Sequence, residues 1–170
     1  MQHARGWRVL RLPLIVIVLL TLVPAALAAP EGPSGAAADR LRAETPAGAE
    51  ITLKRATGVV SALRLTRETA LALPGDTAEA RAGAFFARYG GLFGIRDASG
   101  ELVLRERLTD LTGAAHLTFD QNYRGVSVFG GELRIHFDAA GRLIAANGTF
   151  VPDIDLAPAA AIEPAAAAEA

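Results

Sequence analysis

The stretch from His116 to Asn147 constrains the fold more than any other part of this chain, because apolar and polar residues alternate along it. In its first segment, Leu117, Phe119 and Tyr123 take odd positions, while the even positions hold His116, Thr118 and Asp120. A period of two is typical of a β-strand with one buried face. A turn signal at Arg124-Gly125 and another farther along divide the stretch into three predicted strands.

The second of these strands changes its buried face partway along. Its apolar residues take even positions up to Val128 and odd positions from Leu133 to Phe137. A shift of one residue exchanges the two faces of a strand, so one extra residue must be accommodated between these two parts. A β-bulge does this, and glycine provides the positive φ that a bulge often needs. We therefore predict a bulge at Gly130-Gly131.

The remaining elements are predicted from the same kinds of pattern. Strands are expected over 51–55, 58–66, 101–109 and 142–151. A helix is expected to begin at a segment that resembles a capping box, 76–79, and to stop at Gly90-Gly91. Its apolar residues recur at helical spacing, namely Ala78, Ala82, Phe85, Phe86 and Tyr89. The predicted fold class is therefore α+β, with one helix packed on a curved, bulged antiparallel β-sheet meander.

Residues 1–28 have the pattern of a secretory signal peptide. Three arginines precede an apolar run over 13–23, and the small-residue sequence Ala26-Leu27-Ala28 follows. We predict cleavage after Ala28 and export to the extracellular space or the periplasm. A stable membrane anchor is disfavoured, because the apolar run is shorter than the roughly 20 residues that span a bilayer, and Pro24 interrupts it. The chain contains no cysteine, which excludes a disulfide and a thiolate metal site.

Composition divides the exported part into three segments. Residues 29–49 are rich in Ala, Gly, Pro and Glu, so we expect a flexible linker with at most a short helical turn near 39–43. The folded domain is predicted over 50–155. Residues 156–170 are dominated by alanine. They form either a connector to a further, truncated domain or the low-complexity tail of a complete short protein.

Sequence motifs for catalysis are missing from the chain. A thiol nucleophile is excluded, and the Gly-x-Ser-x-Gly motif of a serine nucleophile does not occur around Ser127. Neither His116 nor His136 begins the HExxH motif that places the zinc ligands of many metalloproteases on a helix. We therefore expect that the chain is not an enzyme.

Two histidines and two aspartates could supply metal ligands from the outer face of neighbouring strands: His116, His136, Asp120 and Asp138. With the predicted bulge counted, His116 is expected near Arg134 rather than opposite His136, so a compact site would need an offset pairing. An exposed polar strand face is therefore favoured over a metal site. Asp153 and Asp155 lack the other oxygen ligands of a calcium loop.

Net charge and the one modification motif favour no further partner. The net charge is -1, and both signs are scattered, so no basic stripe for nucleic acid or anionic lipid is predicted. The sequence Asn147-Gly148-Thr149 fits the glycosylation sequon. Lys54 is the only lysine among 17 basic residues, which indicates a GC-rich bacterial gene. We therefore interpret the Asn-Gly pair as part of a turn or bulge.

The stretch that begins at His116 resembles the fungalysin/thermolysin propeptide (FTP) domain. The family's hallmark is a strand, a tight turn, a strand with a GGEL motif, a turn glycine and an Asn-Gly pair. The matching residues are Tyr123, Gly125, Val126, Val128, Phe129, Gly130, Gly131, Glu132, Leu133, His136, Asp138, Gly141, Asn147 and Gly148. Arg124 replaces the usual asparagine and Ser127 the usual proline. Upstream, residues 85–94 are similar to the family's helix that ends in a YG.LFG motif.

The resemblance implies the N-terminal prosegment of an exported, thermolysin-like zinc metallopeptidase precursor. Such a prosegment acts as an intramolecular chaperone and inhibitor of its cognate metalloprotease domain, which would follow in cis and hold the zinc. This chain would then need no cofactor, and 156–170 would be a connector or the start of a truncated PepSY-type domain. The alternative is a free-standing secreted module that inhibits a protease or binds an extended peptide along an exposed strand edge. A purely structural domain of another secreted protein is a third possibility.

Overall fold

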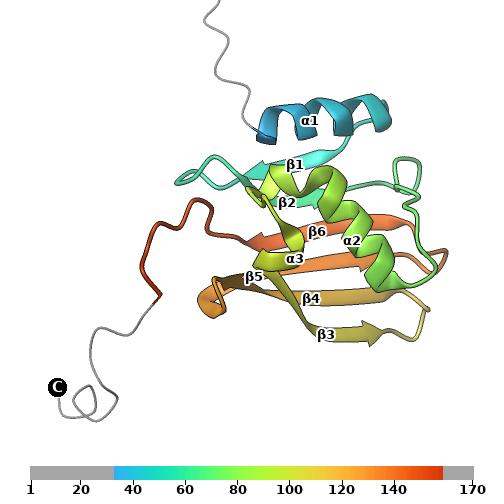
Figure 1. Ribbon diagram of the computed structural model, residues 1–170. Helices are drawn as coiled ribbons and strands as arrows, with labels where there is room; N and C mark the ends of the chain where they lie inside the picture. Colours follow the sequence, from blue (N-terminus) through green and yellow to red (C-terminus); the bar gives the residue numbers. More distant parts are fainter. Residues whose placement is uncertain (1–32, 159–170) are drawn as a thin grey trace, which may run out of the picture.

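A six-stranded antiparallel sheet forms the centre of the molecule, in the order β1-β2-β6-β5-β4-β3 (Figure 1). The computed structural model describes residues 33–158, so the predicted signal peptide and most of the alanine-rich segment lie outside the described residues. The strands are β1 (Glu50–Leu53), β2 (Val60–Arg64), β3 (Leu102–Thr109), β4 (Ala115–Tyr123), β5 (Val126–Phe137) and β6 (Leu143–Thr149). The predicted α+β class and the meander from β3 to β6 are confirmed.

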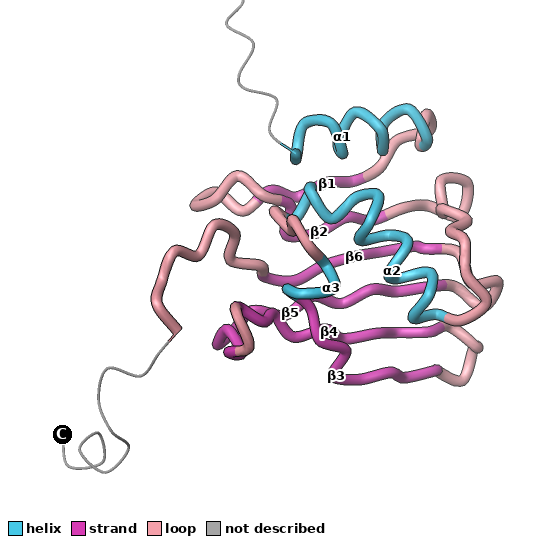
Figure 2. Tube along the Cα trace, viewed as in Figure 1, coloured by secondary structure: helices cyan, strands magenta, loops and turns pink. Residues whose placement is uncertain are grey.

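One face of the sheet is covered by helices, and the other face is open (Figure 2). The helices are α1 (Pro33–Glu44), α2 (Ala78–Tyr89), α3 (Ala98–Glu101) and a 3-10 turn, η1 (Gly90–Phe93). The apolar side chains that face the helices form a single core, which includes Phe85, Phe93, Leu117, Leu133, Ile135 and Phe137. Alternation along each strand therefore separates this core from a polar outer face.

Helix α2 forms where the apolar spacing predicts it. Its cap is Thr77, whose hydroxyl accepts a hydrogen bond from the N–H of Ala80 at 3.1 Å. The predicted apolar face is buried along its whole length. The helix ends at Tyr89, as the two glycines that follow predict, and the chain continues as the 3-10 turn η1. The local signals and the tertiary packing agree throughout this helix.

Helix α1 is longer than the sequence predicts. In place of a short turn near 39–43, twelve residues are helical, with Leu41 fully buried and Ala37 almost so. Glu44 at the end of the helix accepts hydrogen bonds from Arg88 and from the hydroxyl of Tyr89. The helix has one large apolar residue on its buried side, so its stability depends on these contacts rather than on its own amphipathic pattern. The limits of the predicted domain, 50–155, stay a prediction.

The predicted change of face in β5 is confirmed, but the irregularity is larger than one residue. Asp120 pairs with Glu132, and Asn122 pairs with Ser127. In this register the four residues 128–131 therefore lie opposite one residue of β4, Gln121. Leu133 and the apolar residues after it are buried, as the alternation requires. Beyond this irregularity the register of β4 and β5 is regular up to Ala115. We call residues 128–131 the arch.

Candidate functional site

The arch is built around Gln121, the buried residue that faces it from β4. A Cβ atom on Gly131 would lie 2.7 Å from Oε1 and 2.8 Å from Cβ of Gln121, so only glycine fits there. Gly130 has a φ of 74°, a conformation that favours glycine, and its side-chain position is open. The two glycines of the predicted motif therefore do different things: one bends the backbone, and the other makes room for a neighbouring side chain.

Gln121 joins the arch to the chain that leaves the sheet after β6. Its Oε1 accepts from the N–H of Val151 at 2.9 Å, and its Nε2 donates to the carbonyl of Val151 at 2.7 Å. Sequence reasoning missed Gln121. The available signal was its odd position in β4, because a polar residue on the buried face of a strand must find partners there.

A second glycine of the predicted family pattern contacts the same outgoing segment. A Cβ on Gly94 would lie 2.8 Å from Cβ of Pro152, so the turn after η1 packs directly against that proline. Beside it, Arg96 forms an exposed ion pair with Asp153. Three residues thus hold 151–153 in place: Gln121, Gly94 and Arg96. We call these three residues and the segment that they hold the exit clasp.

The arch exposes Phe129, whose exposed fraction is 104%. Val126, just before the arch in the same strand, is half-exposed. Tyr123 lies across the turn, where its ring stacks under the guanidinium of Arg124. Among the described residues, its hydroxyl is the one buried side-chain polar atom without a hydrogen-bond partner. This end of the sheet therefore shows an aromatic side chain that the fold itself does not bury.

The outer face of β4, β5 and β6 carries a row of hydrogen-bonded polar side chains. His116 and His136 lie directly opposite each other, with their Nδ1 atoms 2.8 Å apart. His116 Nε2 lies 3.2 Å from the Asp110 carboxylate, and His136 Nε2 lies 3.0 Å from Oδ1 of Asn147. The predicted position of His116 near Arg134 is wrong. The arch shifts the register by three residues rather than one, which brings the two histidines together.

The environment of this row favours particular charge states. Hydrogen bonds from the Thr112 hydroxyl, and then from His116, hold the pKa of Asp110 well below its usual range. Since an ionised carboxylate only accepts, His116 Nε2 carries the hydrogen that it donates to Asp110. Burial lowers the pKa of His136, and the hydrogen bond to Asn147 opposes part of that shift.

Charges beside the row are paired across the strands. Arg105, at a bulge in β3, donates to Asp120 at 2.8 Å and also contacts Glu132. Arg134 lies 2.8 Å from the same Glu132. The predicted site residue Glu132 is therefore held between two arginines, so its charge is balanced locally. No group of three His, Cys, Asp or Glu side chains that could hold a metal ion occurs within residues 33–158.

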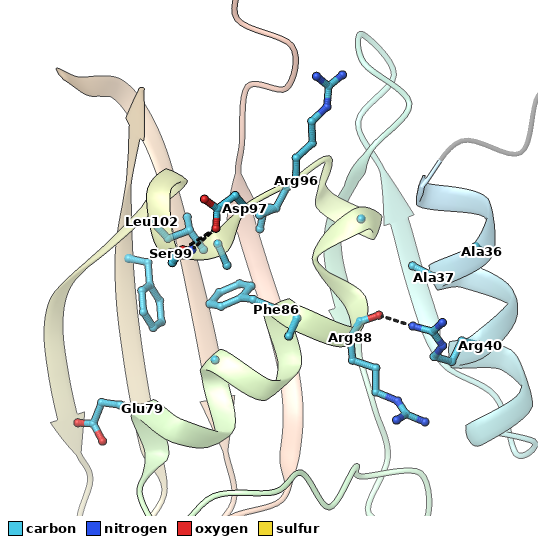
Figure 3. A pocket seen from close by; sticks show the side chains of 16 residues that line it. Ala36, Ala37, Arg40, Glu79, Phe86, Arg88, Arg96, Asp97, Ser99 and Leu102 are labelled. Atoms are coloured by element: carbon cyan, nitrogen blue, oxygen red, sulfur yellow. Dashed lines mark hydrogen bonds between the residues drawn. The ribbon is translucent and has the colours of Figure 1, made fainter. Parts of the chain in front are cut away.

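A groove of about 760 Å³ lies on the helix face between α1, α2 and α3 (Figure 3). Phe86 and Leu102 line it, together with several alanine and glycine residues. Arg40 on α1 donates across to the carbonyl of Arg88 at 3.0 Å, and Asp97 caps α3. None of the predicted motif residues of the sheet lies in this groove. Its polar side chains already serve the fold, so it does not converge on a ligand.

The strands that build the arch and the histidine row also carry the similarity to a known family. Residues 100–150 match the Fungalysin/Thermolysin Propeptide Motif. No curated protein matches the chain. The match confirms the predicted resemblance, and it covers β3 to β6 with the arch and both histidines. Gly94 and the segment 151–153 of the exit clasp lie outside it.

The other predicted residues of the propeptide motif take structural positions. Gly148 lies against β5, where a Cβ would approach the carbonyl oxygen of Glu132 to 2.0 Å. Asp138 accepts from the N–H of Arg142 at 2.8 Å and forms an ion pair with its guanidinium. Positive φ values occur in the turns at Gly125 and Gly141, Leu133 is buried in the core, and Val128 belongs to the arch.

A propeptide motif marks a part of a protease precursor that is not catalytic, in agreement with the missing catalytic motifs. It implies a cognate protease domain as the partner, and the zinc of such a precursor belongs to that domain. None of the helices within residues 33–158 is both long enough and apolar enough to span a bilayer.

Proposed function

We propose that this chain is the N-terminal prosegment of an exported, thermolysin-like metallopeptidase precursor. In this role it is an intramolecular chaperone and inhibitor of the protease domain, to which it is joined in cis. The observation that carries the proposal is the match of residues 100–150 to the propeptide motif. The absence of an HExxH motif from the 170 residues supports it, because catalysis then belongs to the partner domain.

The physical basis of both activities is tethered binding. A linked partner acts at an effective concentration on the order of millimolar. For a prosegment of only micromolar affinity, the bound form would then outnumber the unbound form about a thousandfold. Once the connection is cut, dilution releases the prosegment. A partner that binds the native state also stabilises that state by mass action. The same contact therefore promotes folding and holds the protease inactive.

The proposal assigns a role to each predicted segment. Residues 1–28 direct export and are removed after Ala28. Residues 29–49 lead into the sheet and include α1, which packs on the core. Residues 156–170 connect the domain onward or begin a PepSY-type domain. The partner follows in cis and carries the zinc, so the prosegment itself holds no cofactor. The site of action is outside the cytoplasm, since propeptides of this motif belong to secreted proteases.

A free-standing module that binds an extended peptide along a strand edge is the second candidate. The observation in its favour is the edge strand β3, which exposes Val103 and Leu108. However, β3 is interrupted by a bulge at Arg105 and carries charged residues at its centre. Bulges and charges are features that protect an edge strand from pairing. We therefore favour the prosegment.

The direct test is inhibition in solution. The chain is added in increasing amounts to active thermolysin, and the initial rate of peptide hydrolysis is measured. We expect the rate to fall with a saturable dependence on the concentration of the chain. An unchanged rate, together with no binding by calorimetry, would contradict the proposal.

A further inference from the structure

The arch is an energetically costly irregularity within β5, because it exposes an aromatic side chain. Residues 128–131 leave the ladder, and Phe129 becomes fully exposed within them. In a regular hairpin these residues would pair with β4. A bulge of one residue would be enough to turn Leu133 and the apolar residues after it toward the core. Bulges commonly aim a side chain in a particular direction. The arch therefore presents Phe129 outward.

The exit clasp brings the outgoing chain to the same end of the sheet. In Figure 1 the chain leaves β6 at the end where β4 turns into β5. Gln121 is the shared neighbour, because it fills the space under Gly131 and binds Val151 through both atoms of its amide. Whatever is joined to the chain after 151–153 is thus tethered beside the arch.

The surroundings of Phe129 suit an aromatic anchor. Next to the arch, Glu132 forms ion pairs with Arg105 and Arg134. A partner that covers this region therefore does not bury an unpaired carboxylate. Half-exposed Val126 adds apolar area. A central aromatic side chain with a polar, internally satisfied rim is the usual composition of a protein interface.

We propose that Phe129 on the arch is the principal docking residue for the catalytic domain of the parent protease, and that the exit clasp positions this domain against it. This inference rests on the proposed function and adds the surface through which it acts. Phe129 enters an apolar pocket of the protease domain, while 151–153 fix the direction in which the tether leaves. The groove between the helices takes no part in this contact.

The test compares two equally exposed apolar residues at opposite ends of the sheet. Phe129→Ala removes the proposed anchor, and Leu111→Ala is the matched control in the β3–β4 turn, where Leu111 has an exposed fraction of 108%. Both variants are made in the full chain, and their melting temperatures are compared first. Binding is then measured to a thermolysin variant that lacks the glutamate of its HExxH motif, so that the chain is not cleaved.

We expect Phe129→Ala to raise the Kd at least about tenfold, as for an interface hot spot, and Leu111→Ala to change it less than about twofold. Phe129→Leu should recover part of the affinity, because an apolar side chain remains. If the wild-type chain binds but Phe129→Ala binds equally well, or both variants weaken binding alike, the docking surface is wrong while the proposed function stands. If the wild-type chain does not bind at all, both are overturned.

Discussion

At the scale of single residues, some glycines of the propeptide motif make close contacts that a side chain would prevent. Gly148 is the clearest case, since its Cβ position lies 2.0 Å from the carbonyl oxygen of Glu132 on the neighbouring strand. A backbone atom in a paired strand cannot move away as the end of a flexible side chain can. Glycine at position 148 is therefore a requirement of β5–β6 packing.

The corresponding prediction compares two glycine-to-alanine substitutions. Gly148→Ala should lower the free energy of unfolding by about 3 kcal/mol, because overpacking and an unfavourable φ act together. Gly83→Ala, at an open position inside α2, should raise it by about 0.5–1 kcal/mol. Urea denaturation of both variants measures the difference. Equal effects at the two positions would refute the packing explanation.

A second prediction at this scale concerns the pH dependence of stability. Burial lowers the pKa of His136 in the folded chain, while the unfolded chain has the ordinary value near 6.5. As the pH falls through 6.5, the unfolded chain binds the proton first. The free energy of unfolding therefore decreases until the pH passes the folded-state pKa of His136. The lowered pKa of Asp110 acts only at lower pH, since an unperturbed aspartate titrates near 3.9.

The measurement is urea denaturation of the wild-type chain and of His136→Gln at several pH values between about 7.5 and 5.5, the range around an ordinary histidine pKa. We expect the variant to lose less stability than the wild-type chain over this range. A variant that loses as much would show that His136 does not cause the dependence.

At the scale of elements, periodicity predicted most of the sheet and the main helix, because α2 and the strands have strong apolar patterns. It did not predict α1, whose buried side rests on Leu41 and a few alanines. It also could not give the length of the arch, since an extension by one or by three residues has the same effect on which residues face the core. The contact between His116 and His136 depends on that length, so it was missed for the same reason.

Helix α1 gives a prediction that separates a packed helix from a linker. Leu41→Ala should lower the free energy of unfolding by about 2–4 kcal/mol, because a fully buried leucine is truncated while helix propensity hardly changes. Arg42→Ala, at the next and exposed position, should change it by less than about 0.5 kcal/mol. Thermal unfolding of the two variants, followed by circular dichroism, tests this. Equal melting temperatures would mean that α1 is not part of the cooperative fold.

At the scale of the whole molecule, the two ends of the sheet differ in structure. At one end the β3–β4 turn is closed by Asp110, which accepts hydrogen bonds from the N–H groups of Thr112 and Ala114. The other end carries the arch and the exit clasp, where the outgoing chain is held by contacts from β4 and from the turn after η1. A fixed exit at this end agrees with the proposed binding of a tethered partner.

The central claim, that this chain assists and restrains a protease domain, is tested most directly by refolding. Denatured thermolysin catalytic domain is diluted into buffer with increasing concentrations of the chain, and the amount of correctly folded protease is counted by active-site titration after the chain has been removed. We predict a yield that rises and saturates with the concentration of the chain. A yield no higher than that obtained with the same mass of an unrelated folded protein would contradict the claim.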